Sequence, residues 1–328
     1  MTAPLIHETP SGLYCAIGDF YIDPLRRVAN AVVTHAHADH ARPGNQNYLA
    51  AKEGRRVLRS RLGPSAVLET LPYGETKLIN GVTLSFHPAG HILGSAQVRV
   101  EYRGEVWVVS GDYKIEPDTT CAAFEHVRCH KFITESTFGL PEYVWPIQQE
   151  IFADINRWWK QCRDDGKTAV LLAYALGKAQ RVIAGVDPLI GPIYCHPSVQ
   201  LMNDEYRASG IDLPKTWLPS QAPARKGWGG VLIIAPPSVA NSAWLSQFGT
   251  SSIAMVSGWM LTRQTRKSQS FETGFPLSDH ADWPGLLKGI DESHAENILV
   301  THGQTEAMVK WLNGNGRNAR AVIERSKN

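Results

Sequence analysis

A chain of 328 residues exceeds one typical domain, so two lobes, or one domain with a large insertion, are expected. Hydrophobic residues at 43% and charged residues at 20% are typical of a soluble globular protein and exclude an intrinsically disordered chain, and no apolar run of about 18 residues indicates a membrane span. The net charge of +2, from 33 basic and 31 acidic residues, neither requires nor excludes a nucleic-acid partner.

The N-terminal segment and the cysteines indicate a reducing compartment. Residues 1–8 lack the basic start and the apolar core of a secretory signal, so a cytoplasmic location is expected. The five cysteines are odd in number and show no CxxC spacing, which indicates neither a disulfide framework nor a thiolate zinc site.

Residues 12–23 predict two short strands that flank a Gly18-Asp19 turn. Asp19 and Asp23 are both candidates for a buried carboxylate beside the segment that follows. An aspartate after a glycine is also ordinary turn chemistry, so both interpretations stay open.

The segment HAHADH at 35–40 packs three imidazoles and one carboxylate into six residues. The apolar, β-branched residues 31–34 before it predict a buried strand that delivers the segment to a loop. Alternate residues of an extended segment point to one side, so His35 and His37 can bind one ion, while Asp39 and His40, past a bend, face a second. A chance cluster of surface histidines is the alternative, and the fixed register directly after a strand disfavours it.

A basic group follows within residues 41–75. Its members are Arg55, Arg56, Arg59 and Arg61. Such a group is most often the solvated face of a helix, and we interpret it in this way.

Two further strand-like segments lead to candidate ligands. Residues 82–86 are followed by a glycine-rich turn that carries His91. Residues 106–110 form an apolar strand that leads to Asp112, whose carboxylate is a candidate bridge between two ions. Together with HAHADH, these positions predict a dinuclear metal site.

At this point the sequence resembles a known family. Three segments resemble, in order, motifs two, three and four of the metallo-β-lactamase fold: HAHADH (35–40), AGHILGSA (89–96) and SGD (110–112). Three more resemble motifs A, B and C of its β-CASP nuclease branch, which acts on DNA and RNA: FITESTFG (132–139), SDHAD (278–282) and VTHG (300–303). The segment YALGKAQR (174–181) is similar to another part of that branch. The segments GDFYIDP (18–24) and SGWM (257–260) are most similar to the bacterial ligase-associated DNA exonucleases.

The resemblance implies an α/β protein with a four-layer αββα metallo-β-lactamase fold and an inserted α/β β-CASP lobe. The metallo-β-lactamase domain would comprise residues 1–140 and 275–328, and the lobe residues 141–274. Periodicity alone predicts alternating elements in the lobe, and hence a parallel sheet: helices at 147–159 and 176–183, and strands at 168–175, 230–235 and 253–257. A strand at 297–301 and a helix at about 305–312 then return the chain to the metal domain.

The resemblance also implies a metal-binding role for each matching residue. His35, His37 and His91 would hold the first ion, and Asp39, His40 and His302 the second. Asp112 would bridge the two ions, and we also count Asp39 among the catalytic residues. Asp19 takes the place of the motif-one aspartate that supports the metal loop, with Asp23 the less favoured candidate.

The implied cofactors are two divalent ions, zinc or manganese, which activate water and neutralise phosphoryl oxygens. The leaving alkoxide needs a proton. A histidine outside the metal sphere, oriented by a carboxylate, suits that task because its pKa lies near neutrality. The resemblance assigns this role to His280 and the orienting role to Glu135.

A substrate groove between the lobe and the metal domain is expected. Basic and aromatic side chains suit a polyanion with stackable bases. The candidates are Tyr174, Lys178, Arg181, Arg263, Arg266 and Lys267, followed by Arg225 and Lys226.

The resemblance therefore implies a metal-dependent DNA nuclease, an exonuclease in DNA repair that works with a DNA ligase and a helicase. A β-CASP ribonuclease in RNA processing is the first alternative, although SGWMLTR (257–263) departs from the glycine-rich loop of many RNA-cleaving members. A thioester or lactone hydrolase would not need the lobe or the Glu135 and His280 pair. A scaffold subunit with a decayed site would have lost ligands, and none is missing. Polarity, end chemistry and strand preference stay open.

Overall fold

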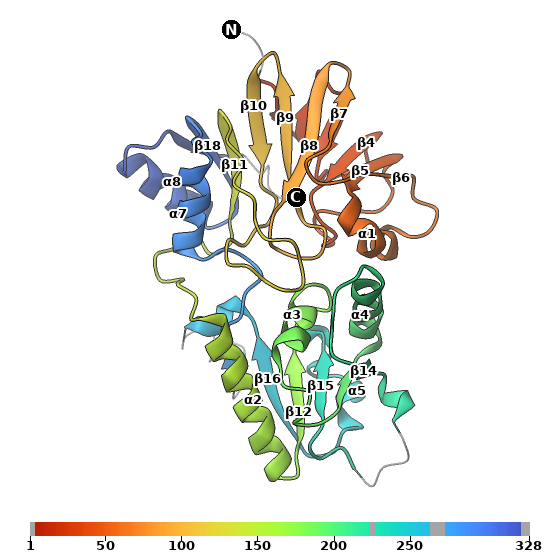
Figure 1. The fold of residues 1–328 in the computed structure, drawn as a ribbon. Coiled ribbons are helices and arrows are strands. Elements are labelled where there is room, and N and C mark those ends of the chain that lie inside the picture. Colours follow the sequence, from red (N-terminus) through yellow and green to blue (C-terminus); the bar gives the residue numbers. More distant parts are fainter. Residues whose placement is uncertain (1–3, 223–226, 263–272, 323–328) are drawn as a thin grey trace. The chain divides into compact units, whose positions relative to one another are not determined.

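The computed structural model describes residues 4–222, 227–262 and 273–322, and the chain forms two compact units (Figure 1). The first unit is discontinuous in sequence and comprises Met1–Val144 and His280–Asn328. The second unit is Trp145–Asp279. In the described part of the chain, every helix is too short or too polar to cross a membrane.

The first unit contains a six-stranded sheet whose strands follow in chain order: β1 (His7–Thr9), β2 (Gly12–Cys15), β3 (Phe20–Ile22), β4 (Asn30–Val33), β5 (Asn47–Ala51) and β6 (Leu68–Leu71). The strand β2 pairs antiparallel with both β1 and β3, and β3 to β6 are parallel. The 3-10 helix η1 (Lys52–Gly54) and the helix α1 (Arg55–Leu62) connect β5 to β6.

A seven-stranded sheet in the same unit has the order β19-β18-β11-β10-β9-β8-β7. Its strands are β7 (Thr76–Ile79), β8 (Val82–Pro88), β9 (Ala96–Tyr102), β10 (Glu105–Val109), β11 (Lys131–Ser136), β18 (Asn297–Gly303) and β19 (Ala319–Ala321). The pairs among β7 to β10 are antiparallel, and those from β10 to β19 are parallel. Therefore β8, β10, β11 and β18 all run in one direction.

The side-chain alternation of β10 shows how this sheet is covered on both faces. Trp107 and Val109 belong to a core that includes residues of the six-stranded sheet. Val106 and Val108 point the other way, into a core formed with α7 (Trp283–Glu292) and α8 (Thr305–Gly314). Because successive side chains of a strand point to opposite faces, a continuous apolar run fits a strand that is buried on both sides.

The second unit is built on a six-stranded sheet in which all strands are parallel. Its order is β14 (Thr216–Trp217), β13 (Ile193–Cys195), β15 (Leu232–Ala235), β12 (Thr168–Leu172), β16 (Ser251–Val256) and β17 (Thr273–Phe275). Its helices are α2 (Gln148–Asp164), α3 (Lys178–Gly185), α4 (Pro197–Ala208) and α5 (Ala243–Ser246), with the 3-10 helices η2 (Pro219–Gln221), η3 (Pro237–Val239) and η4 (Gly258–Leu261). The alternation of strands and helices predicted this parallel arrangement.

Candidate metal centre

Four strands of the seven-stranded sheet carry predicted site residues at or just after their carboxyl ends. His91 follows β8, Asp112 follows β10, Glu135 lies near the end of β11, and His302 lies near the end of β18. Because these strands run in the same direction, their carboxyl ends meet. The HAHADH loop reaches the same edge, since Ala96 at the start of β9 donates a backbone hydrogen bond of 2.8 Å to the Thr34 carbonyl.

A register shift between β11 and β18 sets the direction of the His302 side chain. Thr134 pairs with Val300, whereas Ser136 pairs with Gly303, so β18 has one residue more than β11 at this point. His302 adopts a φ of 53°, in the left-handed region. A bulge of this kind redirects a side chain beside a site. Only glycine fits at 303, because an added Cβ would lie 2.4 Å from the Ser136 carbonyl oxygen.

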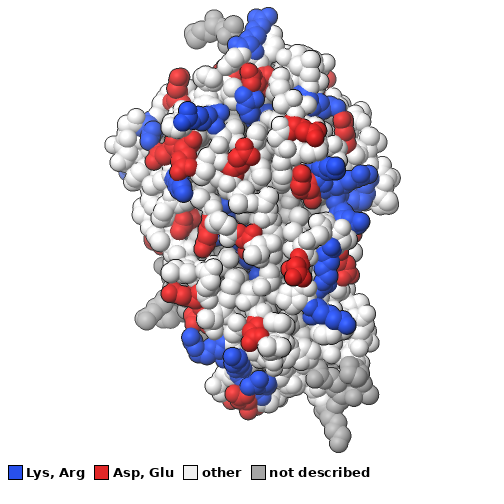
Figure 2. All heavy atoms as spheres, viewed as in Figure 1, with Lys and Arg blue, Asp and Glu red and all other residues white. Residues whose placement is uncertain are grey.

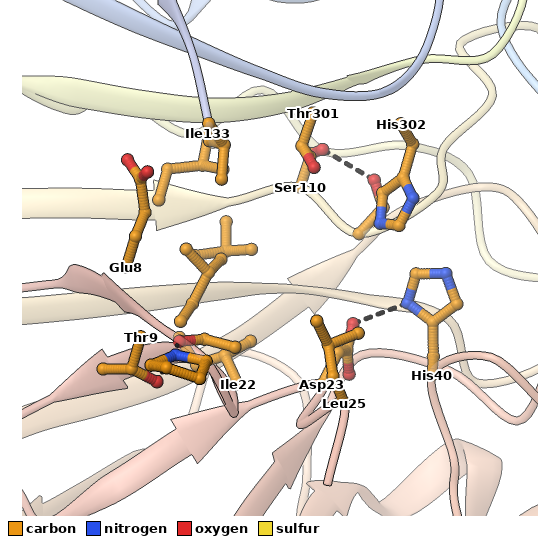
Figure 3. Close-up of a pocket in the computed structure, with 16 residues that line it drawn as sticks. Glu8, Thr9, Ile22, Asp23, Leu25, His40, Ser110, Ile133, Thr301 and His302 are labelled. Carbon is orange, nitrogen blue, oxygen red and sulfur yellow. Dashed lines mark hydrogen bonds and ion pairs between the residues drawn. The ribbon is translucent and has the colours of Figure 1, made fainter. Parts of the chain in front are cut away.

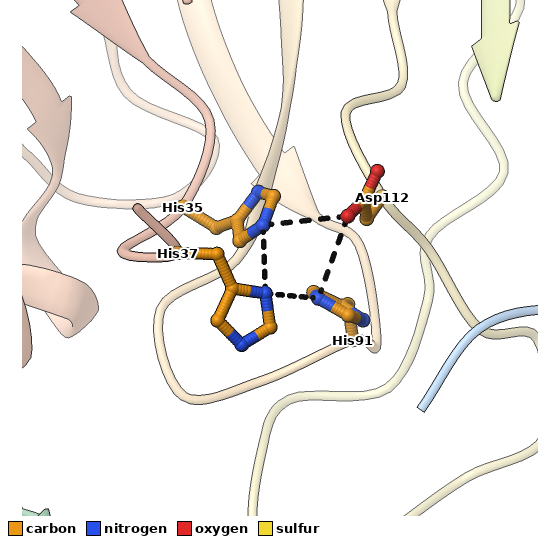
Figure 4. Close-up of side chains that lie close together, drawn as sticks. All are labelled: His35, His37, His91 and Asp112. Atoms are coloured by element: carbon orange, nitrogen blue, oxygen red, sulfur yellow. Dashed lines mark hydrogen bonds and ion pairs between the residues drawn. The ribbon is translucent and has the colours of Figure 1, made fainter. Parts of the chain in front are cut away.

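The side chains of His35, His37, His91 and Asp112 point toward one another (Figure 4). His37 Nδ1 lies 3.1 Å from His35 Nε2 and 3.0 Å from His91 Nε2. Asp112 Oδ2 lies 3.5 Å from His35 Nε2 and 3.8 Å from His91 Nε2. Donors that bind one tetrahedral zinc ion at about 2.0–2.1 Å lie about 3.3 Å apart. The four donors, which we call the first ligand set, therefore fit one ion.

The charge states of the first ligand set also suit a metal. Burial, followed by the neighbouring histidines, holds the pKa of His35 well below its usual range, so its imidazole is neutral and keeps a lone pair for an ion. Burial raises the pKa of Asp112, although His40 opposes the shift. A buried carboxylate of this kind needs more positive charge than the protein supplies, and a divalent cation would provide it.

We call Asp39, His40 and His302, the residues predicted for a second ion, the second ligand set. His40 Nε2 lies 3.6 Å from Asp112 Oδ2 and 3.8 Å from Asp39 Oδ2, and the rings of His40 and His302 are 5.4 Å apart. Asp112 Oδ2 thus lies within 3.8 Å of ring nitrogens from both sets, which suits a bridging carboxylate. The Asp39 side chain is 66% exposed, so this set faces solvent on one side.

The field around His40 favours positive charge. Burial lowers the pKa of His40, but the carboxylates of Asp112 and Asp23 outweigh this effect and raise the pKa to about 10. Partial desolvation of the carboxylate raises the pKa of Asp39, and the nearby His40 outweighs this effect and holds the pKa below its usual value. A field that stabilises a protonated imidazole also stabilises a metal cation at the same place.

Asp23, rather than Asp19, supports the metal loop. Asp23 accepts hydrogen bonds from the Thr34 backbone at 2.8 Å and from the Thr34 hydroxyl at 2.6 Å, and it lies 2.7 Å from His40 Nδ1. Asp19 instead accepts a hydrogen bond of 2.7 Å from the Tyr14 hydroxyl at an exposed turn. The reason is topological: Asp23 follows β3 and Thr34 follows β4, and these strands are parallel neighbours.

A cavity of about 80 Å³ lies behind the second ligand set (Figure 3). His40 and His302 form one end of the cavity, and Glu8 and Thr9 form the other. Apolar side chains line the space between these ends, among them Leu13, Ile22, Leu25 and Ile133. These surroundings lower the local dielectric constant and strengthen the attraction between the carboxylates and a cation.

Glu135 and His280 form a hydrogen-bonded pair beside the ligand sets. His280 Nδ1 lies 3.1 and 3.0 Å from the two carboxylate oxygens of Glu135. Glu135 also accepts hydrogen bonds from the Tyr113 backbone at 2.7 Å and from the Thr137 hydroxyl at 2.5 Å. Burial raises the pKa of Glu135, and His280 with these donors outweighs it, so the carboxylate stays ionised. The ring of His280 lies 4.7 Å from that of His91.

Three partners in this network were not predicted. Thr34 and Thr137 are hydroxyl donors one residue before His35 and two residues after Glu135, and these positions were the available signal. Tyr113 acts through its backbone N–H, which carries no side-chain signal in a sequence.

Three of the predicted substrate-binding residues are described. Tyr174 is 55% exposed, so its ring is accessible. Lys178 and Arg181 are only 4% and 1% exposed. Lys178 Nζ lies 2.9 Å from Asp279 Oδ1, and Arg181 donates a hydrogen bond of 3.2 Å to Gln148. Both residues were predicted to contact substrate at the surface, but in the structure they are buried and paired with residues inside the protein. Arg263, Arg266 and Lys267, with Arg225 and Lys226, lie outside the described residues.

Comparison with known proteins finds relatives that are named as a DNA ligase, an endoribonuclease and a transcription termination factor. No family model matches the chain. Over 318 residues, or 95% of this chain, the sequence is 29% identical to a protein of Opitutus terrae named "Probable DNA ligase". It is 27% identical over 162 residues, 47% of this chain, to Endoribonuclease YSH1 of Gibberella zeae, and 28% identical over 195 residues, 49% of this chain, to Transcription termination factor FttA of Methanosarcina mazei. The matches cover 30%, 18% and 31% of these proteins, so the chain spans less than a third of each.

A solved structure supports the fold. A protein of unknown function from Enterococcus faecalis superimposes with a TM-score of 0.62 at 13% identity, over 91% of this chain and 80% of that one. The architecture is mixed α/β and consistent with a metallo-β-lactamase-like fold. The names of these relatives include an endoribonuclease and a probable DNA ligase, and His35, His37, His91 and Asp112 form a cluster that could hold a metal ion.

Proposed function

We propose that this chain is a metal-dependent phosphodiesterase that hydrolyses DNA from an end, as part of DNA repair. The observation that carries the proposal is the Glu135 and His280 pair beside the first ligand set, whose Asp112 also lies near His40 of the set predicted for a second ion. Hydrolysis of a small thioester or lactone needs activated water but no separate acid of this kind. A phosphodiester has a poor leaving group, and a positioned acid is worth about 10²–10⁴-fold.

The proposed architecture is a four-layer αββα metallo-β-lactamase domain of residues 1–140 and 275–328 with an inserted β-CASP lobe of residues 141–274. The first ligand set would hold one divalent ion and the second set another, with Asp112 shared. The nitrogen and carboxylate donors suit both zinc and manganese. When bound, the ions would lower the pKa of a water molecule and neutralise phosphoryl oxygens.

The chain's own residues would supply the proton and the orientation. Glu135 is ionised and accepts the Nδ1 proton of His280, which fixes the ring and favours the imidazolium form. The proton on Nε2 is then the one that passes to the leaving alkoxide. Asp23 and Thr34 hold the loop of His35 and His40 in place, so that the ligands need little rearrangement when substrate binds.

DNA is preferred over RNA as the proposed substrate because of the extent of the similarity. The match to the probable DNA ligase covers 95% of this chain, whereas the matches to the endoribonuclease and the termination factor cover 47% and 49%. A segment like this chain thus forms part of a protein named a ligase, which supports a shared DNA pathway. RNA hydrolysis is the second candidate, supported by the two RNA-related names. Partnership with a DNA ligase and a helicase, and a cytoplasmic location, stay predictions.

We expect the purified protein, reconstituted with zinc or manganese, to shorten linear DNA from an end and to leave circular DNA intact. The substrates are end-labelled single- and double-stranded DNA and RNA of one sequence, together with a single-stranded circle. The His280→Ala variant, prepared in the same way, controls for a contaminating nuclease. Equal cleavage of the circle would contradict exonuclease action, and faster hydrolysis of RNA than DNA would replace the proposal by its alternative.

A further inference from the structure

Two arginines of the first unit contact the HAHADH loop itself, and Lys and Arg side chains gather on the surface of this unit over α1 (Figure 2). Arg61 Nε, near the end of α1, donates a hydrogen bond of 3.3 Å to the carbonyl of Ala36. Arg42 Nε, just past the loop, donates one of 3.1 Å to the carbonyl of Asp39. The loop is therefore held by a guanidinium group at two points.

The two carbonyls belong to different parts of the predicted metal site. Ala36 lies between His35 and His37 of the first ligand set, whereas Asp39 is a member of the second ligand set. Each ligand set thus has one arginine hydrogen-bonded to its own stretch of the loop.

The packing of α1 fixes the position of Arg61. At the start of the helix, Gly54 packs against the His91 loop, where a Cβ added to Gly94 would lie 2.0 Å from the Gly54 Cα. Near its end, Arg59 donates hydrogen bonds of 3.1 and 2.6 Å to carbonyls of the turn that follows. The basic group of this helix was interpreted as a solvated face, but Arg59 and Arg61 both bind backbone carbonyls.

The backbone of Arg42 is also held in place. Its carbonyl accepts hydrogen bonds of 2.9 Å from the Tyr48 hydroxyl and 3.3 Å from the Asn45 side chain. Arg27, which forms no ion pair with a described residue, packs against Gly44, since an added Cβ there would lie 2.6 Å from Arg27 Nε. Like charges thus gather at this end of the loop, and an anion would stabilise them.

The charge of Arg42 and Arg61 has no carboxylate partner within the protein. A guanidinium group has five N–H donors, and in the described part of the chain each of the two uses only Nε and forms no ion pair. A hydrogen bond to a carbonyl needs no charge, because the amide of Gln or Asn can donate it as well. A positive charge beside a site for metal cations repels them, so both arginines weaken the site unless an anion binds there too.

The unused edge of each guanidinium group suits a phosphate. With Nε directed to the loop, Nη1 and Nη2 form a fork that can donate two parallel hydrogen bonds to the oxygens of one phosphate group. Resting on the proposed nuclease function, we propose that Arg42 and Arg61 bind the phosphate groups on the two sides of the cleaved bond.

Removing single charges from the substrate tests the proposal. The cleaved linkage is first mapped on unmodified linear DNA. Two further substrates each lack one neighbouring charge: one has no end phosphate, and the other has a neutral methylphosphonate at the linkage beyond the cleaved one. The wild-type protein should lose about 10- to 100-fold in kcat/KM on each. Arg42→Gln and Arg61→Gln should show such a loss on unmodified DNA, and each should be insensitive to one of the two modifications.

The salt dependence of binding gives a readout that does not depend on cleavage. DNA with phosphorothioate linkages keeps its charge and is hydrolysed slowly, so it can be titrated with the metal-loaded protein. The slope of log K against log salt should fall by about 0.7–0.9 for each arginine removed, and by about twice that in the double variant. The control double variant, Arg103→Gln with Arg128→Gln, removes the same charge at exposed positions of the same unit and should keep the slope.

A purely structural role predicts a different pattern. If the arginines only held the loop, their loss would lower the metal content and would slow bis-p-nitrophenyl phosphate, which has a single phosphate, as much as DNA. Under the proposal the metal content stays at the wild-type level, and the loss on this small ester is smaller than the loss on DNA by about tenfold or more. Arg42→Lys and Arg61→Lys keep the charge without the fork, so they should recover the salt slope but only part of kcat/KM.

Equal losses on all three DNA substrates, or a fall in metal content, would overturn the roles of Arg42 and Arg61 while leaving the proposed nuclease intact. An equal change of slope in the control double variant would do the same. If the wild-type protein neither binds nor cleaves nucleic acid, the proposed function fails and this inference fails with it.

Discussion

Replacing Asp112 by Ala should remove both metal ions and nearly all activity. Asp112 Oδ2 lies 3.5 Å from His35, 3.8 Å from His91 and 3.6 Å from His40, so it serves both ligand sets. Without it, three histidines and no carboxylate remain in the first set, and the second set loses a negative charge. We expect metal content to fall from about two ions per chain to below one, and activity to fall by on the order of 10³-fold or more.

Elemental analysis after dialysis against metal-free buffer measures the effect. Asp118→Ala is the matched control, because Asp118 follows in the same connection and accepts a hydrogen bond of 2.8 Å from the Thr120 backbone. That variant should keep both ions. Two ions per chain in Asp112→Ala would rule out the bridging role, even if activity were lost.

The His280→Ala variant should keep its metals and turn over slowly. His280 is hydrogen-bonded to Glu135, so we expect its loss to remove a proton donor rather than a ligand. We expect a loss of about 10²–10⁴-fold on DNA. Substrates with a p-nitrophenyl leaving group should be hydrolysed almost normally, because that group departs without a proton.

The measurement is kcat/KM for esters of decreasing leaving-group pKa, with metal content determined on the same samples. Glu135→Gln should give a smaller loss of the same kind, and the double variant should be no worse than His280→Ala. Asp112, Glu135 and His280 offer ligand atoms within 4.8 Å of one another. Loss of one ion in His280→Ala would therefore identify His280 as a ligand instead of an acid.

Short apolar strands before polar loops were predictable from the sequence. The strand expected at 31–34 is β4 (Asn30–Val33), and those expected at 82–86, 106–110 and 297–301 correspond to β8, β10 and β18. Each of these segments is an apolar run that ends at or shortly before a candidate ligand. The sequence therefore indicates both that the segment is a strand and where the strand ends. In contrast, β5 (Asn47–Ala51) was missed, since Asn-Tyr-Leu-Ala-Ala has little β propensity and forms a strand by pairing with β4.

Side-chain contacts that depend on strand order were not predictable. Asp19 and Asp23 are four residues apart and equally acidic, and only the parallel pairing of β3 with β4 brings Asp23 to Thr34. The same limit applies to Lys178. Its charge suggested a surface contact, but its position at the start of α3 directs it to Asp279, which is 101 residues later in the sequence.

The close packing of Gly54 on Gly94 limits how sequences of this kind can diverge. Gly94 has a φ of 73°, and its missing Cβ is what lets the helix approach the His91 loop. Any side chain at position 94 would separate the helix from the loop. Recombination between distant relatives should therefore succeed only when α1 and the 90–94 loop are inherited together.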